Sequence, residues 1–376
     1  MTSRSRGFTF AAVAIALLLA IGIAACGGDD DDNGNGGGGG GGDGGGGAKT
    51  IALLLPETKT TRYEEKDRPI FTDKVKELCA DCKVQYANAS QDASKQQTQA
   101  EAAITRGADV LVLDAVDVAS VGPIVKHAND KGIPVIAYDR LIPDEDIAFY
   151  VSFDNVKQGR IQAQTLLDKL GSGGDGKSIV MVNGAPTDPS AGDYKKGAHQ
   201  VFDKSGVKIA KEFDTPDWSP DKAQLEMEQS ITALGKDGFQ GAYSANDGMA
   251  GGMIAAMKSN GVDPKTKPIT GGDSEAAAIQ RILIGEQYST IYLAIKQQAE
   301  TSAQLAVAAA QGEMDPDGLA KDKVDNGSKE VPSVLLSPIA VTKDNITDTV
   351  IKDGFLTTDE ICTGSYKSAC KEAGIE

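Results

Sequence analysis

Short apolar runs alternate with longer amphipathic segments from residue 50 onward. The apolar runs are four to six residues long and rich in β-branched side chains, as in strands covered on both faces. They predict strands at residues 51–55, 84–87, 110–113, 135–138, 179–183, 240–244, 268–271 and 288–293. Helical spacing of apolar residues predicts helices at 65–78, 94–106, 118–131 and 156–170. The alternation indicates an α/β fold with parallel sheets and right-handed crossovers.

The alternating pattern forms two similar blocks, each opening with a strand that runs into a polar loop. The loop reads LLLPETKTTRYE in the first block and MVNGAPTDPS in the second. In open parallel sheets, ligands bind beyond the carboxyl ends of the strands. Two such sheets facing each other would therefore form a cleft lined by strand ends from both.

The N-terminus predicts export. Arg4 and Arg6 precede an apolar run at 8–23, which is too short for a comfortable membrane span. The run ends in IAAC, and small residues before a cysteine resemble a bacterial lipobox. We expect residues 1–25 to be a lipoprotein signal peptide and Cys26 to carry lipid. An ordinary secretory signal with a chance cysteine is the alternative.

Residues 26–47 are expected to form the lipidated cysteine and a tether. Positions 27–47 hold 14 Gly, 5 Asp and 2 Asn, a composition that cannot form a core. We expect the folded body to be anchored to the outer face of the cytoplasmic membrane, in a periplasm or at the cell surface. The formal charge of −16 argues against a nucleic-acid partner, whose phosphates would repel the chain.

Four cysteines follow Cys26, and an even number in an oxidising compartment predicts two disulfides. Pairing by proximity joins Cys79 to Cys82 and Cys362 to Cys370. A redox pair or half of a zinc site is the alternative for the first two cysteines. However, neither histidine of the chain lies near a cysteine in sequence, so we expect no metal site.

The stretch GSGGDGKS at 171–178 matches the phosphate-binding loop pattern of nucleotide-binding proteins. Such a loop needs a strand before it and a helix after it, so that the helix N-terminus meets the phosphate. Here the expected helix precedes the loop and the expected strand follows. The pattern therefore indicates a connecting loop and no nucleotide cofactor.

Polar and aromatic side chains gather at the ends of the expected strands. The candidate binding residues are Arg62, Tyr63, Asp139, Arg140, Asp188, Ser190, Trp218, Asn246 and Asp273. Carboxylates, amides and guanidinium groups can each bridge neighbouring hydroxyls, and aromatic rings offer flat apolar faces to a sugar. No nucleophile and base stand together. The set favours a polyol-binding cleft without catalysis.

Some of these polar residues have a structural alternative, because Asp, Asn and Ser commonly cap helices at such junctions. We expect Asp247 to cap the helix that runs to residue 257, and Ser219 to cap the helix that follows Trp218. Packing inside the second block is the alternative role for Trp218. No helix begins after Asp139 and Arg140, so capping does not explain that pair.

The segments AYDRLI, DIAFYVSFDN, SANDGMAGG, TGGD and LLSPIAV…NITDTVIKDGF together resemble the periplasmic sugar-binding proteins of bacterial ABC importers, closest to the D-xylose-binding proteins. The resemblance covers residues 50–355. It implies a type I periplasmic binding protein fold, with two Rossmann-like lobes joined by three hinge crossings. The first lobe would comprise 48–154 plus 295–335, the second 155–294 plus 336–358, and 359–376 a C-terminal tail. It also implies sugar-binding roles for Asp139, Arg140, Asn246, Asp273 and Trp218, and for the Arg62-Tyr63 pair.

Two departures from the xylose-binding pattern leave the sugar open. Pro189-Ser190 stands where those proteins have an Asn pair, and Leu293 stands where they have a lysine. In the Arg62-Tyr63 pair, Tyr63 also stands where a Trp is usual. We expect a monomeric receptor that closes on a xylose-like pentose or a related monosaccharide and delivers it to the membrane subunits of an ABC permease. An exported glycoside-processing enzyme or a chemoreceptor input protein is the alternative.

Overall fold

The computed structural model describes residues 48–375. The expected signal peptide, Cys26 and the glycine-rich tether lie outside the described residues. No helix within 48–375 is long and apolar enough to cross a membrane.

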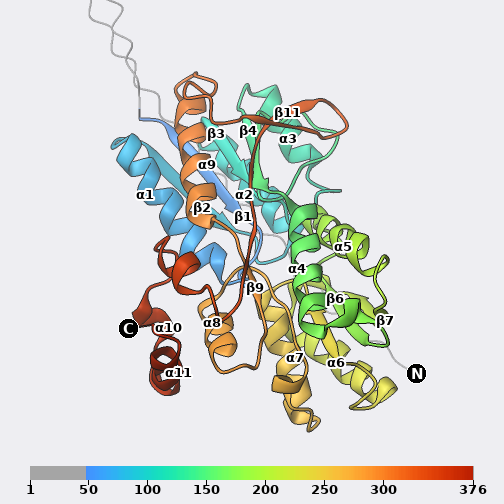
Figure 1. The fold of residues 1–376 in the computed structure, drawn as a ribbon. Coiled ribbons are helices and arrows are strands. Elements are labelled where there is room, and N and C mark those ends of the chain that lie inside the picture. The colour runs from blue at the N-terminus through green and yellow to red at the C-terminus, as the bar shows by residue number, and fades with distance from the viewer. Residues whose placement is uncertain (1–47, 376) are drawn as a thin grey trace, which may run out of the picture. The chain divides into compact units, whose positions relative to one another are not determined.

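A seven-stranded sheet forms the first lobe, in the order β10-β11-β5-β4-β3-β1-β2. Neighbouring strands are parallel except β10 and β11, which pair antiparallel. Helices α1 and α9 cover one face of this sheet, and α2 and α3 cover the other (Figure 1). Alternate side chains of the central strands pack beneath the two pairs of helices. The elements are β1 (Thr50–Leu55), α1 (Arg68–Leu78), β2 (Lys83–Asn88), α2 (Ala93–Thr105), β3 (Val110–Leu113), α3 (Gly122–Asp130), β4 (Val135–Tyr138), β5 (Phe149–Phe153), α9 (Ile295–Ala310), β10 (Asp322–Asp325) and β11 (Glu330–Leu336).

The second lobe is built on a parallel three-stranded sheet in the order β7-β6-β8. Its core is separate from those of the first lobe and includes apolar side chains of four helices. The elements are α4 (Asn155–Leu170), β6 (Ser178–Asn183), α5 (Pro189–Phe202), β7 (Lys208–Asp214), α6 (Pro220–Leu234), β8 (Gly241–Ser244) and α7 (Asp247–Ser259).

The chain passes between the two lobes three times, after β5, after β9 (Thr290–Tyr292) and after β11. β9 pairs antiparallel with β12 (Ile339–Val341) beside these crossings. The expected fold class, two lobes with mostly parallel sheets and three connections, is confirmed.

The C-terminal segment packs against the core that lies beneath α1 and α9, called the first core below. Ile361 of α10 (Thr358–Ile361) and Cys370 of α11 (Lys367–Glu372) are buried there, and α10 contacts α8 (Ala276–Leu283). Disulfides join Cys362 to Cys370 within this segment, and Cys79 to Cys82 after α1.

Two expected strands are wrong in extent. Residues 268–271 form only a single bridge, between Ile269 and Ala242, and 288–293 shorten to the three residues of β9. The apolar pattern at both places reflects burial, which a strand and an irregular buried segment share. The loop at 171–178 does connect α4 to β6, with one turn of 3-10 helix at Ser172–Gly174.

Candidate ligand-binding cleft

A cavity lies between the two lobes, at the carboxyl ends of strands from both sheets. About 350 Å³ between its lining residues is not filled by protein atoms, and part of this space is open solvent. Its lining residues are Thr60, Arg62, Tyr63, Asp139, Arg140, Asp188, Tyr194, Trp218, Ala245, Asn246 and Asp273. Eight of the nine candidate binding residues therefore meet at one place. Ser190 does not line the cavity, whereas Thr60, Tyr194 and Ala245 were not expected there.

Arg62 is held rigidly from behind by Asp67. Its Nε and Nη2 atoms donate to the two carboxylate oxygens of Asp67 at 3.0 and 2.8 Å, and Nη2 also donates to Gln298 Oε1 at 2.8 Å. Burial opposes the charge of the guanidinium, but Asp67 and Asp139 nevertheless raise the pKa of Arg62. The group is therefore a fixed, charged donor at the cavity wall.

Asp139 stands directly after β4 with a backbone φ of 64°, a left-handed conformation that is uncommon outside glycine. Its carboxylate accepts hydrogen bonds from Tyr63 Oη at 3.2 Å and from Gln298 Nε2 at 3.0 Å. Ser152 Oγ donates to its backbone carbonyl at 2.7 Å. These contacts hold the strained turn and aim the carboxylate at the cavity.

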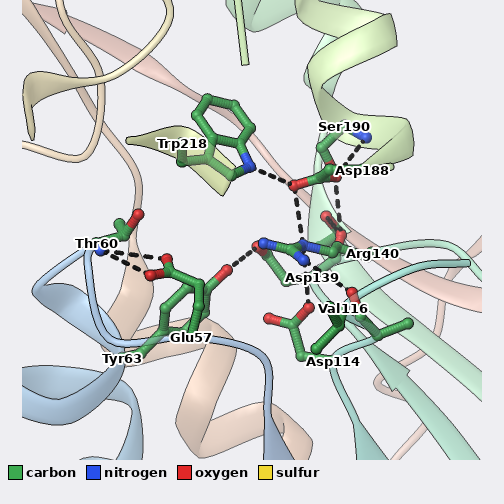
Figure 2. Close-up of polar contacts among 12 residues, drawn as sticks. Glu57, Thr60, Tyr63, Asp114, Val116, Asp139, Arg140, Asp188, Ser190 and Trp218 are labelled. Carbon is green, nitrogen blue, oxygen red and sulfur yellow. Dashed lines mark hydrogen bonds and ion pairs between the residues drawn. The ribbon is translucent and has the colours of Figure 1, made fainter. Parts of the chain in front are cut away.

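Arg140 connects the two lobes and is only 1% exposed. Figure 2 shows its guanidinium between the carboxylates of Asp114 and Asp188. Its Nε lies 2.8 Å from Asp188 Oδ2 and 3.3 Å from Asp114 Oδ1, and Nη1 donates to Ala115 O at 2.8 Å. Despite burial, these carboxylates raise the pKa of Arg140, so the side chain stays charged.

Asp188 caps helix α5 and faces the cavity. It accepts from the backbone N–H of Ser190 at 2.8 Å and from Trp218 Nε1 at 3.1 Å. Burial raises the pKa of Asp188, while the Arg140 guanidinium opposes that rise. Ser190 thus acts on the cavity through Asp188, and its hydroxyl accepts from Asn155 Nδ2 at 3.1 Å.

Trp218 combines the two roles that its position suggested. It lines the cavity, yet it is only 6% exposed and also packs in the second core. Its ring meets Tyr194 edge-on at 6.3 Å between centroids. Ser219 occupies the expected N-cap position of α6, but its side chain makes no capping hydrogen bond there.

Asn246, and not Asp247, caps helix α7. Asn246 Oδ1 accepts from the backbone N–H of Met249 at 3.0 Å, which leaves its amide nitrogen for the cavity. Asp247 is the first residue inside the helix and accepts from Gln287 Nε2 and Thr290 Oγ1, both at 2.7 Å. Burial, followed by the charge of Glu275, raises the pKa of Asp247 to about 7.

Asp273 has a backbone φ of 93°, again unusual for a residue with a side chain. Within residues 48–375 its carboxylate makes no hydrogen bond or ion pair, so it remains an acceptor for a ligand. Burial raises the pKa of Asp273 well above its usual value, and Arg62 opposes the rise. Leu293, by contrast, is fully buried in the first core and does not line the cavity.

The cavity thus offers carboxylate acceptors, guanidinium and amide donors, and aromatic rings, contributed by both lobes. This chemistry matches a compact molecule with several hydroxyl groups and an apolar C–H face. In the part of the chain that the structure describes, no group of three or more His, Cys, Asp or Glu side chains could hold a metal ion.

Comparisons with known proteins give a consistent result. Residues 51–314 match the family model described as periplasmic binding protein domain. The D-xylose-binding periplasmic protein of Escherichia coli is 38% identical, over 81% of this chain and 90% of that protein. A multiple sugar-binding periplasmic receptor of Rhizobium radiobacter is 32% identical, over 83% and 92%. A solute-binding protein structure from Clostridium phytofermentans with bound β-D-glucose aligns with a TM-score of 0.75 at 26% identity, over 83% of this chain and 100% of that one.

Proposed function

We propose, from the premise that this chain belongs to the periplasmic binding protein family, that it captures a monosaccharide outside the cytoplasm and delivers it to an ABC permease. The relatives named above are sugar-binding proteins and not enzymes, so the chain is a sugar-binding receptor of that family. The observation that carries the proposal is the convergence of eight of the nine candidate residues, from both lobes, on one cavity.

Capture would proceed by closure of the lobes on the sugar. Two ion pairs already bridge them: Arg140 with Asp188 at 2.8 Å inside the cleft, and Lys59 with Asp217 at 3.9 Å nearer the surface. A sugar that contacts both walls would add interactions available only in the closed form and would shift the population toward it. The permease would then recognise the closed form.

The sugar class that we favour is a xylose-like pentose or a closely related monosaccharide. Two curated relatives are D-xylose-binding proteins, and the aligned solute-binding structure holds glucose. Ser190 lies behind Asp188, and Leu293 lies in the core. Neither residue supplies the amide or ammonium group that the xylose-binding pattern has there, so a different set of hydroxyl contacts is expected.

The remaining parts of the proposal concern the location of the protein in the cell and its oligomeric state. We propose cleavage before Cys26, lipid attachment to that cysteine, and a tethered monomer that meets the permease at the membrane surface. Intact mass of the protein from its native membrane should show a chain beginning at Cys26 with added acyl groups. A mass that matches an unlipidated N-terminus would overturn the anchor.

A thermal-shift screen tests the proposed function. The folded body would be heated with D-xylose, L-arabinose, D-ribose, D-glucose and D-galactose, each in large excess. A ligand at a hundred times its Kd adds about 2.7 kcal/mol to the free energy of unfolding, which shifts the melting temperature measurably. Calorimetry would then give the affinity. Failure of every sugar in both measurements would refute a monosaccharide receptor.

A further inference from the structure

Asp114 is a buried carboxylate that lies just behind the cavity wall. It follows β3 directly, as Asp139 follows β4, and is fully buried. In the described part of the chain neither of its carboxylate oxygens has a hydrogen-bond partner. Its nearest charged neighbour is Arg140, whose Nε lies 3.3 Å from Asp114 Oδ1 (Figure 2). A buried carboxylate without hydrogen bonds is unfavourable unless its charge is compensated, so its role is electrostatic.

The loop that carries Asp114 is fixed in place. Gln96 of α2 donates from Nε2 to the backbone carbonyl of Asp114 at 2.7 Å, and its Oε1 accepts from the backbone N–H of Val116 at 2.9 Å. The next carbonyl, that of Ala115, accepts from Arg140 Nη1. These bonds fix the backbone on both sides of Asp114, so the carboxylate is presented to the Arg140 guanidinium from a loop that is held in place.

Carboxyl groups outnumber guanidinium groups around the cavity. Arg62 already faces Asp67 and Asp139, and Arg140 already faces Asp114 and Asp188. Asp273 and the buried Glu57 add further carboxyl groups, and burial raises the pKa of both. Among the described residues, the lining contains no lysine and no histidine. A ligand with its own carboxylate would find both guanidinium groups shared between acids, and would lie near several negative charges.

We propose that Asp114 determines the charge specificity of the cavity: it offsets Arg140 from the side away from the ligand, so that neutral sugars are admitted and uronic acids are rejected. This inference rests on the proposed function. Burial raises the pKa of the Asp114 carboxyl well above its usual value; the Arg140 guanidinium, with Nε 3.3 Å from Asp114 Oδ1, opposes that rise and favours the ionised form. In its ionised form Asp114 repels a second anion at Arg140, since like charges at such distances disfavour each other.

The Asp114→Asn variant isolates this effect, because it removes the charge, keeps the shape and breaks no hydrogen bond of the carboxylate. Calorimetry would compare D-glucose with D-glucuronate and D-galactose with D-galacturonate, each pair differing only at C6. In the variant we expect the neutral sugars to bind within about threefold of wild type, and a uronate to gain at least about tenfold in affinity. Asp109→Asn is the control. Asp109 precedes β3, far along the strand from the cavity, and pairs with Lys49; its loss should leave the ratio unchanged.

The outcomes separate the two proposals. If neutral sugars bind but the ratio of uronate to neutral affinity is the same in wild type and Asp114→Asn, charge specificity by Asp114 is wrong and the sugar receptor stands. Wild-type protein that binds a uronate as tightly as its neutral partner would also overturn the inference. If none of these sugars, nor D-xylose, binds wild type, the proposed function itself fails.

Discussion

Gly184 should be required for full affinity toward the sugar because the indole of Trp218 lies directly on it. A Cβ atom at position 184 would stand 2.1 Å from Cη2 and 2.4 Å from Cζ2 of that ring. Carbon atoms pack at about 3.5 Å, so in Gly184→Ala the ring must move by about 1.4 Å or more. The backbone at 184 is not in the left-handed region, so close approach alone requires glycine here.

The displaced ring would lose its hydrogen bond to Asp188, in which Trp218 Nε1 donates at 3.1 Å. Hydrogen bonds to charged groups contribute about 1.5–3 kcal/mol, so the loss of this bond should lower the free energy of unfolding by about that amount. The displaced ring would also lose its stacking face for the sugar, worth about 0.5–1.5 kcal/mol, so affinity for the sugar should fall about 2- to 10-fold. Calorimetry measures the affinity directly. Trp218 is the sole tryptophan of the chain, so its fluorescence emission reports the displacement of the ring. Gly192→Ala in α5 is the matched control, since a Cβ there meets nothing within 4 Å. Normal affinity and unchanged emission in Gly184→Ala would refute the reasoning.

Three further predictions concern charge, pH and covalent structure. Arg140→Ala should weaken sugar binding by at least about tenfold and also lower stability, since two buried carboxylates lose their counter-charge; full affinity in calorimetry would contradict this. Folding raises the pKa of Asp247 from 3.8 to about 7, so the folded state binds a proton that the unfolded chain releases, and stability should fall as pH rises between those values. Urea unfolding at about pH 5 and pH 8 should show a smaller fall in Asp247→Asn than in wild type; an equal fall would rule out Asp247 as a source. Non-reducing peptide mapping of exported protein should find two disulfide-linked pairs, Cys79–Cys82 and Cys362–Cys370. Free thiols at these four cysteines would contradict this prediction.

Most of the residues that line the cavity could be predicted from the sequence, because a parallel sheet brings the residues after its strands to one edge. Asp139, Arg140 and Asn246 each stand just beyond a short buried strand, and the carboxyl ends of parallel strands meet at one edge. Asp114 carries the same signal, an acid directly after the apolar run at 110–113. It could have been found by the same reasoning and was missed.

Other parts of the site had no local signal. Gln298 holds Arg62 from 236 residues further along the chain, so only the fold reveals that contact. Tyr194 sits in a helical pattern that is typical of core residues, and its second role at the cavity wall is invisible in sequence. Asn246 and Asp247 are both good capping residues, and the choice between them depends on where the helix begins.

The three crossings have a consequence for the order in which the protein folds. Strand β5 is covered on its outer edge by β11, and the whole of the second sheet, from Ser178 to Ser244, lies between them in the chain. A chain that emerges N-terminus first therefore has all strands of the second sheet available while the edge of β5 still lacks its partner. Exposed strand edges invite pairing with other chains. We expect β5 to be the segment that most needs protection from aggregation until Glu330–Leu336 arrives.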